Sequence, residues 1–218
     1  MRLYYFTAEQ WGLKVLIERR IKVSQLDDLN DPFEMYGMSV PTPAERRAFK
    51  VLRTRVCKTI GVICLSEKWN CPVMWAHYAD RHRGLCLGFD VIGSKGVYYS
   101  PRKLKRQLAP DTMNEEVMET LLLTKFKQWE YEGERRLIVP LLNKVGSNFF
   151  QAFGQDLVLR SVYIGSRCTL TAHDVARAIS TFENRVTILG TRAAFTKFEV
   201  LRDARGRGGE AVVGADKE

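Results

Sequence analysis

The stretch GVICLSEKWNCPVMWAHYADRHRGLCLGFDV, residues 61–91, decides the fold class of this chain. GVICLS (61–66) and GLCLGFDV (84–91) each predict a buried strand, because both are short apolar runs rich in β-branched or large side chains. Pro72 favours the first turn of a helix between these strands, and Gly84 is where that helix is expected to end. A helix this short between strands favours an α+β fold over a doubly wound parallel sheet.

The same alternation of short elements continues on both sides of this stretch. Thr42, Pro43 and Glu45 predict the N-cap, first-turn proline and capping glutamate of a further helix. Other helices are expected over residues 111–129 and 171–182, and strands at LYYF (3–6), IKVS (21–24), ERRLIVPL (134–141), DLVLRSVYIG (156–165), VTIL (186–189) and AAFTKFEV (194–201). We therefore expect one α+β domain over residues 1–201, with mixed, largely antiparallel sheets and flanking helices. A glycine-rich tail over residues 202–218 is expected to be disordered.

Composition narrows the classes of partner. The chain has 218 residues, enough for a full hydrophobic core. Its five cysteines are an odd number without a C-x-x-C pair, which favours a reducing, cytoplasmic location. No apolar run reaches the ~18 residues of a membrane span, so no membrane partner is expected. A formal net charge of +9 favours an anionic partner such as a nucleic acid, a nucleotide or an acidic protein.

The segment WAHYADRHRG (75–84) contains two of the three histidines of the chain. His77 and His82 are five residues apart, or about 140° around an α-helix, unlike the i, i+4 pair that binds zinc. We therefore expect no metal site. One interpretation is a half-buried helix with Trp75 and Tyr78 in the core. The other is one wall of a nucleotide pocket, in which Trp75, His77, Tyr78 and Arg81 contact the ligand.

A second polar cluster lies in QWEYEGERRLIV (128–139). If this segment is extended from Glu132 onward, Glu132, Glu134 and Arg136 share one face of a strand. Adjacent carboxylates are costly unless their face lines a polar cleft or pairs internally. One interpretation is an edge strand with a self-paired face. The other is a functional carboxylate that can stabilise a developing cation, with the pKa of one glutamate raised by the other.

Several motifs together carry a resemblance to a known family. They are N-D-P-F-E (30–34), L-S-E (65–67), W-x-H-Y-A-D-x-H-x-G (75–84), W-x-Y-E-x-E-x-R (129–136) and V-Y-I-G-S-R-C (162–168). In order and spacing they resemble a bacterial family that is classed as a domain of unknown function. The resemblance runs from Tyr4 to about Ile179 and implies no reaction by itself.

At the level of a superfamily, the arrangement is similar to that of ADP-ribosyltransferases. Those enzymes carry a polar or aromatic residue on the first strand, a serine on a later strand and E-x-E on a further strand. The resemblance places Arg2 or Tyr4 at the first position and Ser66, in C-L-S-E, at the second. It makes Glu132 and Glu134 the E-x-E pair, with Glu134 as the catalytic carboxylate. It implies an ADP-ribosyltransferase-like fold, NAD as substrate and no metal.

The implied chemistry is physically reasonable. Breaking the nicotinamide–ribose bond of NAD builds a cation on the ribose, as in glycoside hydrolysis, and a fixed carboxylate stabilises such a cation. Tyr4 or Trp75 is expected to stack on nicotinamide. Arg136, or Arg81 together with His77, is expected to bind the pyrophosphate, because a guanidinium fork suits phosphate oxygens.

Other function classes remain open. The basic side chains of Arg46, Lys50, Arg53 and the run RKLKR (102–106) favour a nucleic-acid-binding or nuclease module. A non-catalytic nucleotide-binding domain would use the same pocket without turnover. The transferase interpretation implies a nucleic-acid or protein acceptor. It also implies a role as a toxin or phage-defence effector, with an antitoxin or another operon partner.

Overall fold

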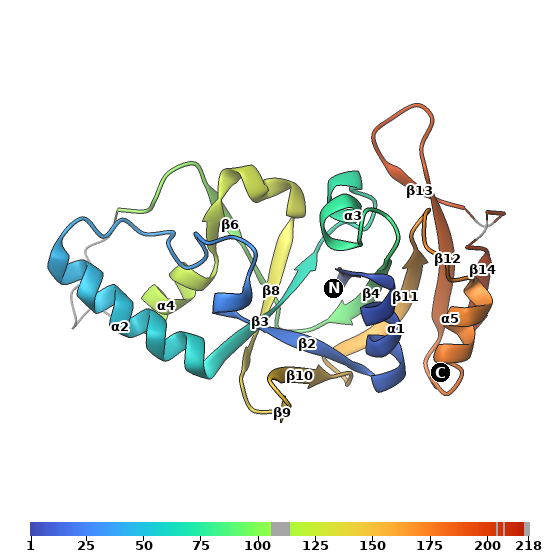
Figure 1. The fold of residues 1–218 in the computed structure, drawn as a ribbon, viewed down its shortest axis with the longest axis horizontal. Coiled ribbons are helices and arrows are strands. Elements are labelled where there is room, and N and C mark those ends of the chain that lie inside the picture. Colours follow the sequence, from blue (N-terminus) through green and yellow to red (C-terminus); the bar gives the residue numbers. More distant parts are fainter. Residues whose placement is uncertain (106–113, 204, 207, 216–218) are drawn as a thin grey trace. The chain divides into compact units, whose positions relative to one another are not determined.

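The computed structural model describes residues 1–105, 114–203, 205–206 and 208–215. They form a mixed α/β structure that divides into two compact units. Unit 1 comprises Met1–Ile21, Leu65–Gly93 and Gln151–Glu218, and unit 2 comprises Lys22–Cys64 and Ser94–Phe150. Each unit is assembled from segments far apart in the sequence, as the colours of Figure 1 show, so the sequence contains no single linker between them.

Unit 1 is built on a twisted sheet in which the neighbouring strands follow the order β13-β12-β11-β4-β1. The pairs are antiparallel except for β11 and β12, which run parallel. The strands are β1 (Arg2–Thr7), β4 (Leu85–Val91), β11 (Leu157–Ile164), β12 (Val186–Ala193), β13 (Val200–Arg202) and β14 (Glu210–Val213), which pairs with β12. Its helices are α1 (Glu9–Glu18), α3 (Pro72–Tyr78) and α5 (Ala172–Ala178).

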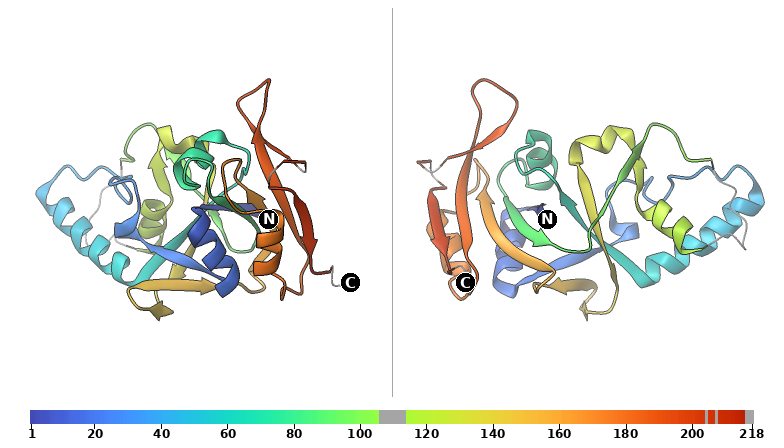
Figure 2. Two further views of the ribbon diagram at one scale, coloured as in Figure 1. Left: turned by 45° about the vertical axis from the view of Figure 1, so that its right-hand side comes forward. Right: turned by 180° about the vertical axis from the view of Figure 1, so that it is seen from behind.

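Strand β4 lies inside this sheet, between β1 and β11, and its sequence LCLGFDV is apolar on both faces. Its Phe89 lies opposite Leu3 of β1 and opposite Leu159 of β11, and all three side chains are buried. Helix α5 packs beside β12 and β14, and α1 contacts both α5 and β4. Figure 2 shows α5 beside these C-terminal strands in both of its views.

Unit 2 contains the longest helix of the described residues, α2 (Pro43–Thr59). Its other helices are α4 (Glu115–Leu122) and the 3-10 helices η1 (Leu26–Asp28) and η3 (Lys127–Glu132). Its strands are β2 (Arg20–Gln25), β3 (Ile60–Ser66), β5 (Lys95–Gly96), β6 (Tyr98–Ser100), β7 (Thr124–Phe126), β8 (Glu134–Pro140), β9 (Lys144–Val145) and β10 (Asn148–Ala152). Strand β8 pairs with β3 and β5, and β6 runs parallel to β7. Three of these strands belong partly to unit 1. Strand β2 begins in unit 1, and strands β3 and β10 end there.

The core of unit 2 lies between α2, α4 and the segment that precedes α2. Phe49 and Val56 of α2 pack in one cluster with Val117 and Leu121 of α4, together with Met35. The predicted capping box of α2 is confirmed, because Thr42 Oγ1 accepts from Glu45 N at 3.2 Å and Thr42 N donates to Glu45 at 3.0 Å. Such a cap contributes about 1 kcal/mol and fixes where the helix begins.

Several expected elements differ from the structure. The helix expected over 111–129 is limited to α4 in the described part, where β7 and η3 replace its second half; residues 111–113 lie outside the described residues. The strand expected over 194–201 is only β13, from Val200. Strand β14 lies within the segment that was expected to be disordered. It is a regular strand there, because it pairs with β12. Within the described residues, no helix combines the length and apolar character needed to cross a bilayer.

Candidate functional site

Five charged side chains are buried together in unit 2, and we call them the carboxylate cluster: Glu34, Lys125, Glu132, Glu134 and Arg136. None is more than 7% exposed. Buried charges are rare unless they are paired, so this concentration is the strongest chemical signal in the described residues.

The backbone explains why the glutamates converge. Glu132 is the last residue of η3, and Gly133 then adopts a left-handed conformation at φ 48° before β8 begins at Glu134. Alternation along β8 turns Glu134 and Arg136 to the same buried face. Glu34 enters from the N-D-P-F-E turn, where Asp31 O accepts from Glu34 N at 3.0 Å.

Arg136 is the centre of the cluster. Its Nε and Nη2 donate to Glu134 at 2.7 and 3.0 Å, and its Nη1 and Nη2 donate to Glu34 at 3.0 and 2.8 Å. A further bond joins Nη1 to the carbonyl oxygen of Leu122 at 2.7 Å. These five bonds match the five N–H donors of a guanidinium. In this conformation Arg136 has no donor left for a pyrophosphate, so the structure assigns it to internal pairing instead of the expected ligand contact.

Lys125 joins all three carboxylates. Its Nζ lies 2.5 Å from Glu132 Oε2, 3.0 Å from Glu134 Oε2 and 3.5 Å from Glu34 Oε1. Burial alone lowers the pKa of Lys125, but the carboxylates of Glu134, Glu132 and Glu34 outweigh that effect and raise the pKa above its ordinary value. The lysine is therefore a permanent cation inside unit 2.

The raised pKa that was expected for one of the two glutamates is not found at Glu134. Burial raises the pKa of this carboxyl, but Arg136 and Lys125 act more strongly and lower the pKa to about 2. The thiol of Cys64 also hydrogen-bonds to Glu134, and burial keeps the pKa of that thiol well above its usual range. Glu134 is therefore an ionised carboxylate with fixed partners. Its backbone N–H is bound as well, since it donates to Tyr99 Oη at 2.7 Å.

The cluster is not electrically balanced. Three carboxyl groups face two cations, so one negative charge is in excess when all five side chains are ionised. An excess charge that is buried and held by neighbours interacts strongly with a cation that develops nearby, because the interior screens less than water.

A pocket of 330 Å³ adjoins the cluster, and Lys125 belongs to both. We call it the aromatic pocket, because its lining includes the rings of Phe33, Tyr36, Phe126 and Trp129. The rest of the lining is Asp31, Gly37, Ser100, Pro101, Arg102, Lys103, Thr124 and Lys125. The Nζ of Lys125 lies 5.0 Å from the centroid of the Trp129 ring, so this cation connects the pocket wall to the carboxylates.

The remaining expected ligand residues belong to unit 1. Tyr4 and Ser66 are direct partners across β1 and β3, so two positions named by the resemblance are adjacent. Burial, helped by Tyr163, raises the pKa of Tyr4 to about 12, so its hydroxyl stays protonated. Ser66 is buried, and its Oγ accepts from Lys68 N at 3.1 Å.

Trp75 is a core side chain, which excludes the expected stacking on a ligand in this conformation. It is fully buried, and its Nε1 donates to the carbonyl oxygen of Trp69 at 2.6 Å. Helix α3 ends at Tyr78, earlier than expected, and Asp80, Arg81 and His82 adopt positive φ angles of 43°, 55° and 69°. The helix that was expected to continue to Gly84 therefore stops at Tyr78.

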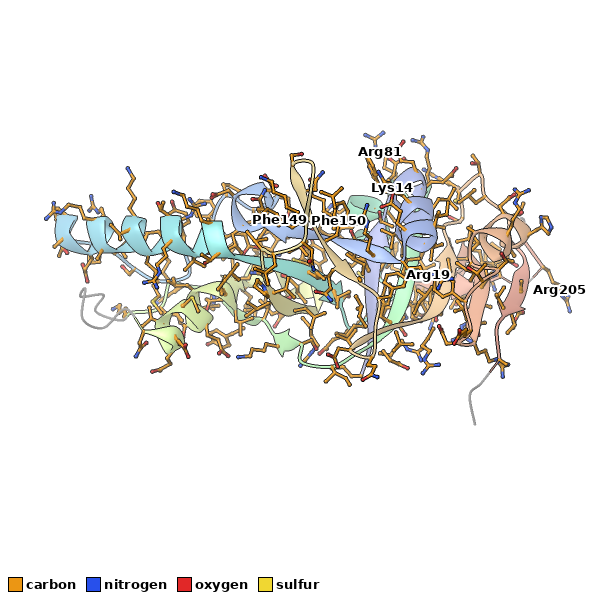
Figure 3. All side chains as sticks on the ribbon, turned by 90° about the horizontal axis from the view of Figure 1, so that it is seen from below. Lys14, Arg19, Arg81, Phe149, Phe150 and Arg205 are labelled. Carbon is orange, nitrogen blue, oxygen red and sulfur yellow. The ribbon has the colours of Figure 1, made fainter. Side chains whose placement is uncertain are left out.

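The other polar side chains of this segment lie at the surface. His77 and Arg81 are exposed, and Figure 3 shows the side chain of Arg81 extending outward from the ribbon. Tyr78 is half-buried, with its ring edge-on to His77 at a centroid distance of 6.1 Å. The sequence also predicts that these residues and the E-x-E pair line one cleft; since they belong to unit 1 and the pair belongs to unit 2, this stays a prediction.

The basic residues of α2 are partly engaged. Arg46 donates to the carbonyl oxygens of Pro41 at 2.5 Å and Val40 at 3.2 Å, and Arg53 pairs with Asp27. Lys50 lies between them on α2 and is exposed. Of the run RKLKR, Arg102 and Lys103 line the aromatic pocket, while Arg106 lies outside the described residues.

Sequence reasoning missed Glu34, Lys125 and the aromatic pocket. The N-D-P-F-E motif contains Glu34, which lies 102 residues before Arg136. The motif was identified from the sequence, but its contact with Arg136 was not. In the described part of the chain, no group of three or more His, Cys, Asp or Glu side chains is arranged to hold a metal ion. Comparison of the chain with protein-family models, curated proteins and solved structures finds no match.

Proposed function

We propose that this chain is an ADP-ribosyltransferase-like enzyme that cleaves NAD and transfers ADP-ribose to an acceptor. The observation that carries the proposal is the carboxylate cluster, in which the E-x-E pair of Glu132 and Glu134 is buried with one negative charge in excess. A preorganised buried anion is what a ribosyl cation requires, because the site needs no reorganisation when the charge develops.

The strand order supports the same proposal. The resemblance requires a first strand, a serine-bearing strand and an E-x-E strand. In unit 1, Tyr4 of β1 pairs with Ser66 of β3, and in unit 2, β8 with Glu134 also pairs with β3. Each unit therefore contains one of the pairings that the resemblance names, the first strand with the serine-bearing strand in unit 1 and the E-x-E strand with β3 in unit 2.

In the proposed reaction, the bond between C1′ of the ribose and the nicotinamide nitrogen breaks, and its electron pair leaves with nicotinamide. The positive charge thereby moves from the pyridinium ring to the ribose, where the excess charge of the cluster stabilises it. A lone pair of the acceptor then forms the new bond to C1′, and the acceptor's proton passes to a carboxylate. We assign the cation-stabilising role to Glu134 and the acceptor-facing role to Glu132.

Nicotinamide release from NAD tests the proposal. Glu134→Gln is expected to lower the release rate by roughly 10²–10³-fold, because the amide keeps the shape but not the charge. Glu132→Gln is expected to change acceptor transfer more than NAD cleavage. Glu130→Gln is the matched control, since Glu130 is exposed and pairs with Lys127 at 3.6 Å, outside the carboxylate cluster. Normal turnover by Glu134→Gln would refute the assignment.

A second candidate function is nucleotide binding without turnover. Absence of turnover is favoured by the complete use of the five Arg136 donors and by the low pKa of Glu134, which are features of a structural ion network. Calorimetric binding of NAD without nicotinamide release would select this function. Absence of both binding and release would reject both candidates.

A further inference from the structure

The aromatic pocket of unit 2 presents rings that the fold itself leaves uncovered. Phe33 is 64% exposed and Phe126 is 50% exposed, although both line the same pocket. Tyr36, three residues after Phe33, and Trp129, three residues after Phe126, complete the aromatic lining from the same two segments. Aromatic rings that gather around a pocket and remain exposed mark a surface that a ligand covers, and a planar ligand can stack on them.

The turns around the pocket hold these rings in place. Asp31 Oδ1 accepts from Phe33 N at 2.9 Å, which fixes the turn that presents Phe33. On the opposite segment, Ser100 Oγ donates to the carbonyl oxygen of Arg102 at 2.6 Å. The pocket is therefore largely preformed, which lowers the entropic cost of binding.

Two cations lie close to the Tyr36 ring of this pocket. The Nζ of Lys103 and the guanidinium carbon of Arg53 each lie 5.7 Å from the centroid of the Tyr36 ring. Arg102, Lys103 and Lys125 are the cations that line the pocket itself. Arg53 lies on α2, so positive charge continues beyond the pocket along α2. A ligand with repeated anionic groups fits this distribution better than a ligand with one.

The volume limits what enters. At 330 Å³, the pocket is at the small end of the ~300–1,000 Å³ that is usual for ligand sites. It suits a single base with its sugar better than a whole dinucleotide. Aromatic stacking surfaces inside a basic surface are the combination that binds single-stranded nucleic acids with little sequence preference.

We propose that the aromatic pocket binds one base of a single-stranded nucleic acid. The base stacks on Phe126 and Trp129, and the neighbouring phosphates contact Lys103, Arg102 and Arg53. This inference concerns binding and stands apart from NAD cleavage. If the chain also transfers ADP-ribose, the strand is its acceptor, and Lys125 then places the acceptor base beside the carboxylate cluster.

The test is fluorescence polarisation of a labelled single strand of about ten nucleotides, within the ~4–16 nucleotides of comparable sites, with no NAD present. Phe126→Ala is expected to weaken binding roughly tenfold, because it removes one stacking surface. The ring is half exposed, so its removal is expected to leave the fold intact. Lys103→Ala is expected to lower the slope of log Kobs against log salt by about one phosphate contact.

Matched controls come from unit 1. Phe198→Ala removes an exposed phenylalanine and Lys14→Ala an exposed lysine, and neither is expected to change binding. Equal binding by Phe126→Ala and wild type would overturn the proposal, as would equal losses in Phe126→Ala and Phe198→Ala. Displacement of the strand by NAD with the same dependence on Phe126 would also overturn it, because the pocket would then be a subsite for NAD. Since NAD is absent from the main assay, failure of NAD cleavage leaves this test unaffected.

Discussion

Arg136 and Glu134, two residues apart on β8, are joined by two parallel hydrogen bonds inside unit 2. The Nε–Oε1 distance is 2.7 Å and the Nη2–Oε2 distance is 3.0 Å. This bidentate arrangement is the strong form of an arginine–carboxylate pair. Because both partners are buried, the pair matters most when it is broken, since the remaining charge has no water to solvate it.

Arg136→Met is therefore expected to lower the free energy of unfolding by about 3–5 kcal/mol, because it strands the carboxylates of Glu134 and Glu34. The measurement is urea denaturation followed by circular dichroism. Arg135→Met is the control on the same strand, where the half-buried Arg135 donates to Ser94 O at 2.8 Å. Arg135→Met is expected to lower the free energy of unfolding by about 1 kcal/mol. Similar losses in the two variants would contradict a buried network centred on Arg136.

The low pKa of Glu134 predicts a specific pH window. Its pKa is about 2 in the folded state against an ordinary value of 4.5, so the folded state binds this proton more weakly than the unfolded state does. The stabilisation is fully present above pH 4.5 and is lost as the pH falls toward 2. We expect the free energy of unfolding to decrease by up to about 3 kcal/mol over this window. Denaturation at a series of pH values measures it, and the decrease must be smaller in Glu134→Gln.

Local signals in the sequence were sufficient for part of the fold. The capping residues Thr42 and Glu45 located the start of α2, because a capping box acts through bonds between near neighbours. Strand alternation correctly placed Glu134 and Arg136 on one face of β8, but Glu132, expected on the same strand, is the last residue of η3. The expectation that such a face either lines a cleft or pairs internally was also sound, and internal pairing is what these two side chains do.

The site could not be completed in the same way. Glu34 reaches Arg136 from 102 residues away, and a single sequence contains no signal for a contact at that distance. Lys125 was placed in a long helix, whereas α4 ends at Leu122 and Lys125 lies on β7. A lysine at the end of an apolar helical run is expected to be solvated. In the structure Lys125 lies instead on β7, which pairs with β6, and its side chain is buried.

The end of the WAHYADRHRG segment supplies a prediction for unit 1. A Cβ at Gly84 would lie 2.0 Å from the carbonyl oxygen of Thr7, closer than any real contact, and the obstacle is backbone. Gly84 also donates to Ala79 O at 2.8 Å and accepts from Gly165 N at 3.0 Å, so the segment cannot easily move aside. Gly84→Ala is therefore expected to cost about 1–3 kcal/mol or more in unfolding free energy. Thermal denaturation would measure the loss.

Gly154→Ala is the matched control for that substitution. Nothing lies within 4 Å of a Cβ at Gly154, and its φ is outside the left-handed region. We expect its stability to be unchanged or slightly increased, because alanine restricts the unfolded chain more than glycine does. Equal stability of the two variants would show that the close approach of Gly84 to Thr7 is not a constraint in solution.

The basic face of α2 gives the last prediction, and the contacts of its three residues separate their expected effects. Lys50 is exposed, so Lys50→Glu is expected to weaken binding to a single strand and to lower the salt slope by about one contact, with stability changed by less than about 0.5 kcal/mol.

Arg46→Glu and Arg53→Glu are expected to lose stability as well, since Arg46 bonds to two carbonyl oxygens before α2 and Arg53 pairs with Asp27. Lys14→Glu, on the exposed side of α1, controls for the change in net charge. Polarisation measured at several salt concentrations decides the outcome. If Lys50→Glu and Lys14→Glu have the same salt slope, Lys50 belongs to a solvated face, and phosphate contacts are confined to the cations around Tyr36, which are Lys103 and Arg53.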